Sequence, residues 1–277
     1  MAITESGPDT LRVTPAAGAL GAVVTGLDLR ATDESTVAAL RELLTEYLVV
    51  VVPGQHELTD EAQVALMLQF GEPYLHPIAR AMGQTELRAG HIVDDVDHPP
   101  FQDQYHTDVS WDPAPPTWGC LRMIERPPMG GDTMFSNMYA AYDALSPAMQ
   151  RSLEGLTAWH DPGEGKAFRA KSGDAATDAA EQLVPGASHL VVQTHPETGR
   201  PYLYVNRGFT RRIEQYTPAE SRAVLDLLFA HSENPNFQMR WTWSVGDVVI
   251  WDERCTHHFA VADYYPNRRE VARVNVR

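Results

Sequence analysis

The last segment of the chain alternates polar and apolar side chains, and this pattern restricts the fold more than any other in the sequence. The alternating residues are Arg269, Val271, Arg273 and Asn275 in one series and Ala272, Val274 and Val276 in the other. Because successive side chains of a strand point to opposite faces of a sheet, the segment is predicted to be a strand with one apolar and one largely polar face. Several strands are expected between residues 238 and 276, so the chain is predicted to be rich in β structure.

Further strands and several helices are predicted along the chain. Strands are expected as a short pair within 11–29 and singly at 48–53, 118–124, 133–138, 190–193 and 202–205. Helices are expected at 33–47, at 59–70, from Ser146 onward, and at 217–231 after the capping box Thr217-Pro218-Ala219-Glu220. Residues 1–10 are expected to be a loose tail, 71–100 irregular loops at a pocket rim, and 160–187 either a mobile lid or a long surface excursion.

Length and composition set the broad class of the protein. The 277 residues are enough for one large core, and no repeat or linker-like segment divides them, so a single domain over 1–277 is predicted. The fold class predicted is mostly β with flanking helices. A net charge of −15 argues against a nucleic-acid or anionic membrane partner, because phosphate contact needs a basic surface. The oligomeric state stays open, with a homo-oligomer as one option.

The expected location is the cytoplasm. Two cysteines, Cys120 and Cys255, are too few for a disulfide framework. Residues 1–10 carry no basic and apolar signal-peptide pattern, and no apolar run approaches the length that spans a membrane. A small-molecule substrate is therefore the expected partner, and local arginines still permit an anionic one.

One short motif points to a metal. In an extended segment, His106 and Asp108 of His106-Thr107-Asp108 project to the same side. Together with a distant histidine they offer two imidazoles and one carboxylate, the ligand set of non-haem Fe(II) oxygenases with open coordination positions. Alone, the His-x-Asp pair is common and favours the ordinary alternative, a surface turn residue beside a hydrogen-bonded histidine. The second histidine is found near Trp251-Asp252, in a His257-His258 doublet.

Several further strings, in order, carry a family resemblance over nearly the whole chain. They are Phe70-Gly71-Glu72-Pro73, His106-Thr107-Asp108, Gly130-Gly131-Asp132-Thr133, Tyr139-Ala140-Ala141-Tyr142, Trp251-Asp252 through Ala260-Val261, and the arginines Arg268, Arg269 and Arg273. With them the chain resembles the taurine dioxygenase-like family of Fe(II)/2-oxoglutarate-dependent dioxygenases. The resemblance implies a double-stranded β-helix (jelly-roll) core, with Fe(II), 2-oxoglutarate and O2 as metal and cosubstrates.

The resemblance also implies roles for individual residues. The iron ligands would be His106, Asp108 and His258, because family register selects the second histidine of the doublet and leaves His257 facing away. Thr133 and Arg269 would hold the distal carboxylate of 2-oxoglutarate, a task that suits the rigid donor fork of arginine. The alternative for Arg269 is an exposed position in the Arg268-Arg269 run.

Three residues are assigned to the substrate. His76 and Arg273 match substrate-lining positions of the family, and Gln102 stands where taurine-specific members have an asparagine. The alternative for Arg273 is a place beside the proximal carboxylate of the cosubstrate. Ala79 replaces a tyrosine of those members. These departures argue against taurine and favour a different, larger acid. The alternative for His76 is an ordinary loop histidine.

The reaction implied is oxidation of an unactivated carbon, by hydroxylation, desaturation or epoxidation, coupled to conversion of 2-oxoglutarate to succinate and CO2. The substrate predicted is a small anionic molecule, such as a carboxylated intermediate of secondary metabolism. The main alternative is a taurine- or alkylsulfonate-type dioxygenase of sulfur scavenging. A non-oxidative metal enzyme on the same scaffold and a non-catalytic binding protein remain further alternatives, because fold alone does not dictate chemistry.

Overall fold

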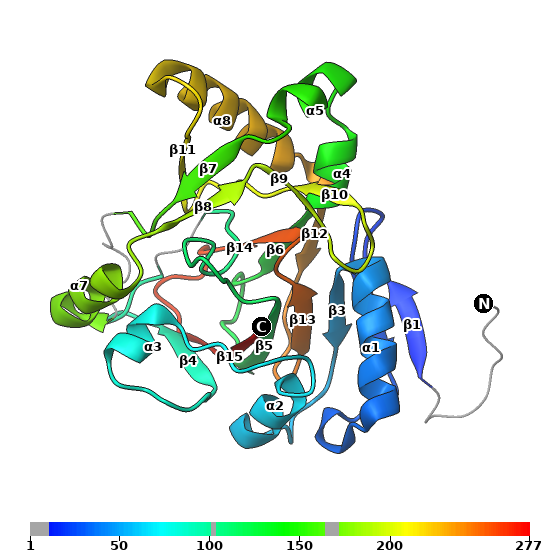
Figure 1. Cartoon of the computed structure of the whole chain (residues 1–277). Coiled ribbons are helices and arrows are strands. Elements are labelled where there is room, and N and C mark those ends of the chain that lie inside the picture. The colour runs from blue at the N-terminus through cyan, green and yellow to red at the C-terminus, as the bar shows by residue number, and fades with distance from the viewer. Residues whose placement is uncertain (1–10, 101–103, 164–171) are drawn as a thin grey trace.

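The computed structural model describes residues 11–100, 104–163 and 172–277. The predicted tail at 1–10, Gln102 and part of the predicted lid region lie outside these ranges. Among the described residues the strands outnumber the helices, and the helices lie around the sheets (Figure 1). Within the described ranges no helix is long and apolar enough to cross a membrane.

The largest sheet has seven strands in the order β1-β2-β3-β13-β5-β15-β4. Its strands are β1 (Arg12–Pro15), β2 (Ala22–Thr25), β3 (Val49–Val52), β4 (Gly90–Asp94), β5 (Trp118–Glu125), β13 (Val248–Asp252) and β15 (Arg269–Val276). Neighbouring strands are antiparallel except β2 and β3. The predicted C-terminal strand is thus β15, and it lies between β5 and the edge strand β4.

A three-stranded sheet, β12-β6-β14, contains the His257-His258 doublet. It consists of β12 (Gln238–Trp241), β6 (Thr133–Asn137) and β14 (Thr256–Ala260). Two smaller sheets are formed by β11 (Thr210–Ile213), β7 (Thr157–His160) and β8 (Ala187–Leu190), and by β9 (Val192–Thr194) with β10 (Pro201–Leu203).

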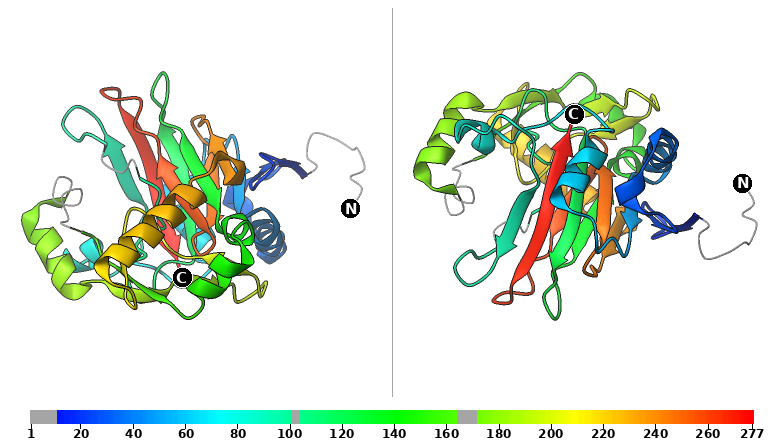
Figure 2. Two further views of the ribbon diagram at one scale, coloured as in Figure 1. Left: turned by 90° about the horizontal axis from the view of Figure 1, so that it is seen from above. Right: turned by 90° about the horizontal axis from the view of Figure 1, so that it is seen from below.

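Helices cover the outside of this β framework. They are α1 (Glu34–Tyr47), α2 (Asp60–Met67), α3 (Pro77–Ala81), α4 (Met138–Asp143), α5 (Pro147–Leu153), α7 (Asp174–Leu183) and α8 (Pro218–Ser232), with 3-10 turns η1 (Leu29–Ala31) and η2 (Pro235–Phe237). The right-hand view of Figure 2 shows α2 lying across the large sheet over β15. The capping box of Thr217 and Glu220 is formed at the start of α8, as predicted.

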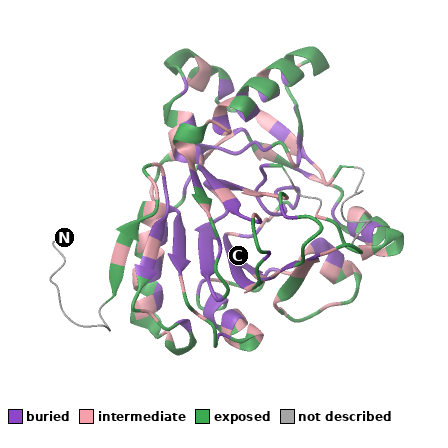
Figure 3. Ribbon diagram, turned by 180° about the vertical axis from the view of Figure 1, so that it is seen from behind, coloured by how far each residue is buried: buried purple, intermediate pink, exposed green. Residues whose placement is uncertain are grey.

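The central strands of the large sheet are buried on both faces (Figure 3). In β3, Val50 and Val52 pack toward α1 and α2, whereas Val49 and Val51 join the inner core with Phe135. Each such valine contributes about 1.5–3 kcal/mol on full burial. The inner core therefore lies between the large sheet and β6, and it supports the strands that carry the site.

Two segments differ from the sequence prediction. Residues 71–100, expected to be irregular, contain α3 and β4. Helix α3 begins where the His76 side chain accepts the backbone N–H of Ile78 and Pro77 occupies the first turn. Strand β4 is mostly exposed or half-buried and carries little apolar alternation, so only its pairing with β15 reveals it.

The second difference concerns strand beginnings. Leu48, predicted to open a strand, instead ends α1 in a left-handed conformation, with φ of 66°, and β3 begins one residue later.

Residues 174–183 of the region expected to be a lid or surface excursion form α7, which packs against α3.

Candidate active site

A cavity of about 990 Å³ gathers the predicted site residues that the structure describes. Its lining includes His106, Asp108 and His258, the pair Thr133 and Arg269, and His76 and Arg273. Residues 269, 271 and 273 of β15 all face it, so the predicted alternation places the polar face of this strand on the cavity. Ala272, Val274 and Val276 are buried, and Val274 and Val276 pack on the helix-covered side.

His106 and His258 are brought together by backbone pairing. The His106 N–H donates to His258 O at 2.9 Å, and the His258 N–H donates to His106 O at 2.8 Å. This isolated antiparallel bridge pairs the His106 segment alongside β14. It places the two imidazole centroids 4.1 Å apart. Asp108, two residues after His106, then points to the same place, as expected for an extended segment.

Three lone-pair atoms converge at this point. Asp108 Oδ1 lies 3.6 Å from His106 Nε2 and 3.8 Å from His258 Nε2, and the three ligand atoms lie within 4.8 Å of one another. His106 Nδ1 lies 2.8 Å from Gln104 O, a contact in which only Nδ1–H can donate, so Nε2 carries a lone pair. A cation explains this convergence of acceptors, and two imidazoles with one carboxylate suit Fe(II).

Protonation states of the group agree with metal binding. Burial lowers the pKa of His258 well below its usual range, with the neighbouring His106 acting in the same direction, so the imidazole is neutral. Burial opposes ionisation of Asp108, but the Arg273 guanidinium and the imidazoles outweigh it and hold the pKa well below its ordinary value. Neutral imidazole and ionised carboxylate are the forms that bind metals.

His257 points away from this cluster. It is buried, and burial lowers its pKa to about 3. Its Nε2 has no hydrogen-bond partner among the described residues. Neighbours on a strand face opposite sides, so the structure brings His258, and not His257, beside Asp108.

The turn after the His-x-Asp motif is strained. Val109 has φ of 51°, in the left-handed region that β-branched residues rarely adopt. It is buried against Tyr74, Trp111, Val184 and Phe209, which form a small apolar cluster. Such strain costs on the order of 1–3 kcal/mol and is concentrated at functional sites. Here it turns the chain immediately after Asp108.

Arg269 lines the cavity and is only 4% exposed. Its Nε donates to Gly131 O at 3.1 Å, and its guanidinium lies 5.8 Å from the Tyr264 ring centroid. Burial lowers its pKa, yet a guanidinium remains charged in proteins. No described carboxylate forms a direct ion pair with it, although Asp94 and Asp132 lie near enough to favour its charged form, and Arg269 lines the cavity.

The exposed position that was the alternative for Arg269 is occupied by Arg268 instead. Its side chain is 40% exposed and forms ion pairs with Glu125 and Glu270. Adjacent residues of one run therefore have opposite environments, and Arg269 is the one in the cavity.

Thr133 lines the same cavity and is buried. Its hydroxyl oxygen accepts a hydrogen bond from Trp243 Nε1 at 3.0 Å. Trp243 belongs to the inner core and is 2% exposed. Its contact with Thr133 is a feature that sequence spacing does not indicate.

Arg273 and His76 lie near the metal-ligand cluster. Arg273 Nη1 donates to Asp108 at 3.1 and 3.2 Å. The Nδ1 of His76 accepts from the N–H of Ile78 at 3.2 Å, and burial, reinforced by Arg273, lowers the histidine pKa to about 3. Its proton is therefore on Nε2, which makes His76 a neutral donor. Ala79 also lines the cavity, whereas Gln102 lies outside the described residues.

Two residues beside Asp108 were not singled out from the sequence as site residues. Asn275 Nδ2 donates to Asp108 Oδ2 at 2.9 Å, and the Asp108 N–H donates to Glu253 Oε2 at 3.1 Å. Asn275 could have been found from its place on the polar face of β15. No sequence signal relates Glu253 to a residue so far away in the chain.

A second group of possible ligands, His195, Asp252 and Cys255, lies beside the hairpin that leads into β14. Nδ1 of His195 accepts the backbone N–H groups of Glu197 and Thr198, each at 3.3 Å. Nε2 therefore carries the proton and donates it to Asp252 Oδ2 at 3.0 Å. Both imidazole nitrogens are thus engaged in hydrogen bonds.

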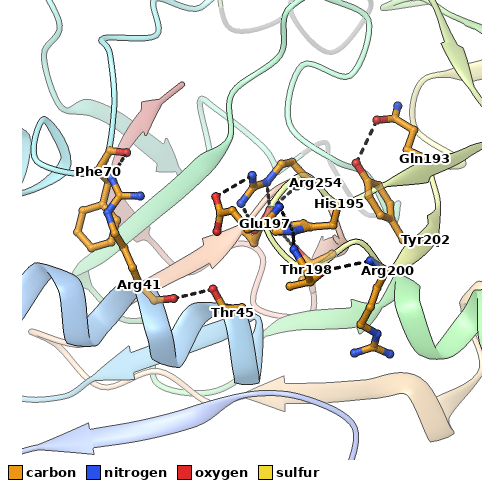
Figure 4. A network of polar contacts seen from close by, with 12 residues as sticks. Arg41, Thr45, Phe70, Gln193, His195, Glu197, Thr198, Arg200, Tyr202 and Arg254 are labelled. Atoms are coloured by element: carbon orange, nitrogen blue, oxygen red, sulfur yellow. Dashed lines mark hydrogen bonds and ion pairs between the residues drawn. The ribbon is translucent and has the colours of Figure 1, made fainter.

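Arg254 completes this network (Figure 4). Its Nε donates to Asp252 Oδ1 at 2.8 Å, and its Nη1 donates to Glu197 at 3.2 Å. Thr256 Oγ1 donates to Asp252 O at 2.6 Å. The lone pairs with which His195 and Asp252 would bind a metal are already used in hydrogen bonds. The network therefore anchors the turn that precedes His258.

Comparison with known proteins identifies the same family as the sequence motifs. The model of the family described as "Taurine catabolism dioxygenase TauD, TfdA family" matches residues 12–275. An alpha-ketoglutarate-dependent sulfate ester dioxygenase of Pseudomonas putida is 32% identical over 272 residues, covering 96% of this chain and 89% of the relative. Pentalenolactone F synthase of Streptomyces arenae is 32% identical over 283 residues, covering 95% and 94%.

Solved structures show the same similarity. A putative alpha-ketoglutarate-dependent taurine dioxygenase from Burkholderia xenovorans has a TM-score of 0.80 and 32% identity, covering 96% of this chain and 89% of its own. AAD-2, crystallised in complex with Mn(II) and N-oxalylglycine, has a TM-score of 0.79 and 26% identity, covering 96% and 97%.

Proposed function

The chain belongs to the taurine catabolism dioxygenase TauD, TfdA family and is an Fe(II)- and 2-oxoglutarate-dependent dioxygenase, and we propose that it oxidises an unactivated carbon of a small anionic acid. Family membership argues against the non-oxidative enzyme and the non-catalytic binding protein considered from the sequence. The observation that carries the proposal is the convergence of His106 Nε2, His258 Nε2 and Asp108 Oδ1 in a cavity that also holds the buried Arg269.

The ligand cluster would hold Fe(II) through His106, Asp108 and His258. Arg269 and Thr133 would bind the distal carboxylate of 2-oxoglutarate, because both line the cavity and the Thr133 hydroxyl, which accepts from Trp243, keeps its own proton as a donor. When bound, iron with 2-oxoglutarate and O2 supplies the oxidising power, and 2-oxoglutarate leaves as succinate and CO2. The protein's own contribution is placement of the reactants and exclusion of water.

The substrate would lie at the other side of the cluster. Arg273 offers a cation and His76 a neutral N–H donor, a pair suited to an acidic group. Ile78, Ala79, Val109, Trp111 and Phe209 make much of the remaining lining apolar. A cavity of about 990 Å³ is at the upper end of the size of small-molecule sites. We therefore favour an acid with a sizeable apolar skeleton, such as a carboxylated natural-product intermediate.

A taurine-, alkylsulfonate- or sulfate-ester-type reaction is the second candidate. The relatives are equally compatible with it, since one of them is named as a sulfate ester dioxygenase and another as a natural-product synthase. Arg273 would serve a sulfonate as well as a carboxylate. What favours the larger acid is the room beside Ala79.

The proposal includes the architecture around the site. We propose that the large sheet and the β12-β6-β14 sheet form a double-stranded β-helix, and that the chain acts as a single domain in the cytoplasm. The antiparallel pairing of the β12-β6-β14 sheet, the antiparallel pairing of the large sheet apart from β2 with β3, and the shared core between the sheets support this arrangement.

Anaerobic addition of Fe(II) and 2-oxoglutarate to the metal-free protein tests the reaction class. A visible charge-transfer absorption, followed by succinate release when O2 is admitted, is expected for the wild type. Asp108→Ala should lose both while keeping its circular dichroism spectrum. A colourless wild-type mixture that releases no succinate contradicts the proposal.

Substrate identity needs a second experiment. Bulky carboxylic acids, taurine, alkylsulfonates and alkyl sulfate esters would each be tested for stimulation of succinate release above the uncoupled rate. Stimulation by carboxylic acids alone supports the favoured candidate. Stimulation by the sulfur compounds alone replaces it with the second.

A further inference from the structure

The two oxygens of the Asp108 carboxylate have different surroundings. Oδ1 faces the imidazoles, at 3.6 Å from His106 Nε2 and 3.8 Å from His258 Nε2. Oδ2 accepts the Asn275 amide at 2.9 Å. Arg273 Nη1 bridges both oxygens, at 3.1 and 3.2 Å. The carboxylate is therefore turned so that one oxygen points into the cluster and the other is bound from behind.

The backbone of Asp108 is held as well. Its N–H donates to Glu253 Oε2 at 3.1 Å, and Glu253 is fully buried. The following residue, Val109, has the strained φ of 51°. Glu253 thus satisfies the N–H of a turn that no regular strand partner reaches, and it fixes the point from which the Asp108 side chain departs.

We propose that Asn275 and Glu253 are positioning residues that hold Asp108 so that it binds the metal through Oδ1 alone. This inference rests on the proposed function, since it takes Asp108 as a ligand of Fe(II). A carboxylate that binds through one oxygen uses one coordination position, whereas a chelating carboxylate uses two. Keeping Oδ2 engaged therefore preserves the open positions on which 2-oxoglutarate and O2 depend.

Arg273 does not replace Asn275 in this role. Its side chain is 27% exposed and lines the cavity, where it is available to a substrate anion. A substrate anion that takes the Nη1 donors of Arg273 removes them from Asp108. Asn275 is 8% exposed, and its Oδ1 is buried with no hydrogen-bond partner among the described residues. A buried amide oxygen without a hydrogen bond lowers stability. The presence of an asparagine at this position is therefore explained by the contact of its Nδ2 with Asp108.

Binding of Co(II) to the metal-free full-length protein tests the proposal, because absorption by Co(II) reports both affinity and coordination number. Asn275→Leu removes the donor at similar size, and Glu253→Leu removes the acceptor. Both are expected to weaken Co(II) binding by roughly 10–100-fold, the usual effect of losing a residue that orients a ligand. Both should also change the intensity and shape of the Co(II) absorption. Glu253→Gln keeps an acceptor oxygen and should stay near the wild type in both measurements.

A matched control separates positioning from stability. Asn137→Leu removes a different half-buried amide, which donates to Ala19 O and caps α4 and has no hydrogen bond to Asp108. It should lower the unfolding midpoint and leave Co(II) affinity and absorption unchanged. If Asn275→Leu does not fold, Asn275→Ser is the substitute, since its hydroxyl is too short to reach Oδ2.

Two results would overturn the proposal. One is wild-type Co(II) affinity and absorption in Asn275→Leu and Glu253→Leu. The other is a Glu253→Gln variant as impaired as Glu253→Leu, which would make charge, and not the hydrogen bond, the relevant property. Failure of the proposed function looks different: Asp108→Ala would then bind Co(II) as tightly as the wild type.

Discussion

The indole Nε1 of Trp243 donates a hydrogen bond to the hydroxyl oxygen of Thr133 at 3.0 Å, beside the cavity that Thr133 lines. An indole N–H can only donate, so the threonine oxygen must accept and its own proton remains available. Trp243 thereby orients Thr133 as a donor toward the cavity that Arg269 also faces. A residue of the inner core therefore supports the proposed cosubstrate site.

We expect Thr133→Val and Trp243→Phe to weaken 2-oxoglutarate binding to different extents. A hydrogen bond to a charged group contributes about 1.5–3 kcal/mol, so Thr133→Val should raise the KM for 2-oxoglutarate by roughly 10-fold or more. Trp243→Phe leaves the hydroxyl present but unoriented, and should raise it about 5-fold, equivalent to ~1 kcal/mol. Steady-state succinate formation measures both. Trp241→Phe, which loses a bond to Asp247 instead, is the control and should leave KM unchanged.

Substitutions in the Arg268-Arg269 pair should have opposite outcomes. Arg269→Ala removes a buried cation and should raise the 2-oxoglutarate requirement by about 30-fold or more, since truncating one partner of a buried charge pair costs on the order of 2–5 kcal/mol. Arg268→Ala breaks only exposed ion pairs, worth about 0–1 kcal/mol, and should leave the requirement unchanged. Titration of the 2-oxoglutarate charge-transfer absorption measures the difference. Equal effects of the two substitutions would place the cosubstrate site elsewhere.

Gly119 makes room for the residues behind Asp108. A Cβ at this position would lie 2.3 Å from Trp251 Cζ2 and 2.7 Å from Glu253 Oε1. Gly119→Ala should therefore lower the free energy of unfolding by about 1–3 kcal/mol, as overpacked cores do. It should also weaken Co(II) binding, because Glu253 is displaced. Urea denaturation and Co(II) titration provide the two measurements.

Gly18→Ala is the matched control for that variant. A Cβ there meets nothing within 4 Å, so the change should be neutral or slightly stabilising. A Gly119→Ala protein as stable as Gly18→Ala would show that the strand can shift to accept the methyl group.

His91 should make stability depend on pH. Its Nε2 lies 2.8 Å from Asp60 Oδ2 and its Nδ1 lies 2.6 Å from Glu270 Oε1, and these two contacts raise its pKa against a smaller effect of burial. Arg122 and Arg268 also pair with those carboxylates. Because the folded-state pKa is the higher one, the stabilisation is fully present below the unfolded value and is lost as pH rises through the folded value.

The difference in unfolding free energy between wild type and His91→Gln measures this effect. It should be largest below about pH 6.5, the ordinary histidine pKa, and should shrink as the pH is raised above that value. The side chain is 38% exposed, so solvent screening limits the expected size to about 0.5 kcal/mol. A difference that does not change with pH, or grows as pH rises, would contradict the prediction.

Regular elements with strong local signals were predictable. The alternation of 269–276 predicted β15 and its polar face, and the Thr217 capping box predicted α8, because both signals lie within one element. Strand β4 and helix α3 were missed. The first depends on the partner strand β15, and the second is too short for a helical period to show.

The sequence by itself determined the chemical inventory: the His-x-Asp motif, the histidine doublet, the arginine spacing on one strand face, and the resemblance that relates them. Tertiary structure decided which members of each pair face the cavity. It buried Arg269 and exposed Arg268, and it turned His258 to Asp108 and His257 away. It also placed Asn275, Glu253 and Trp243 behind the residues that they orient. Contacts between residues more than a hundred positions apart depend on how sheets pair and pack, and no local pattern records that pairing.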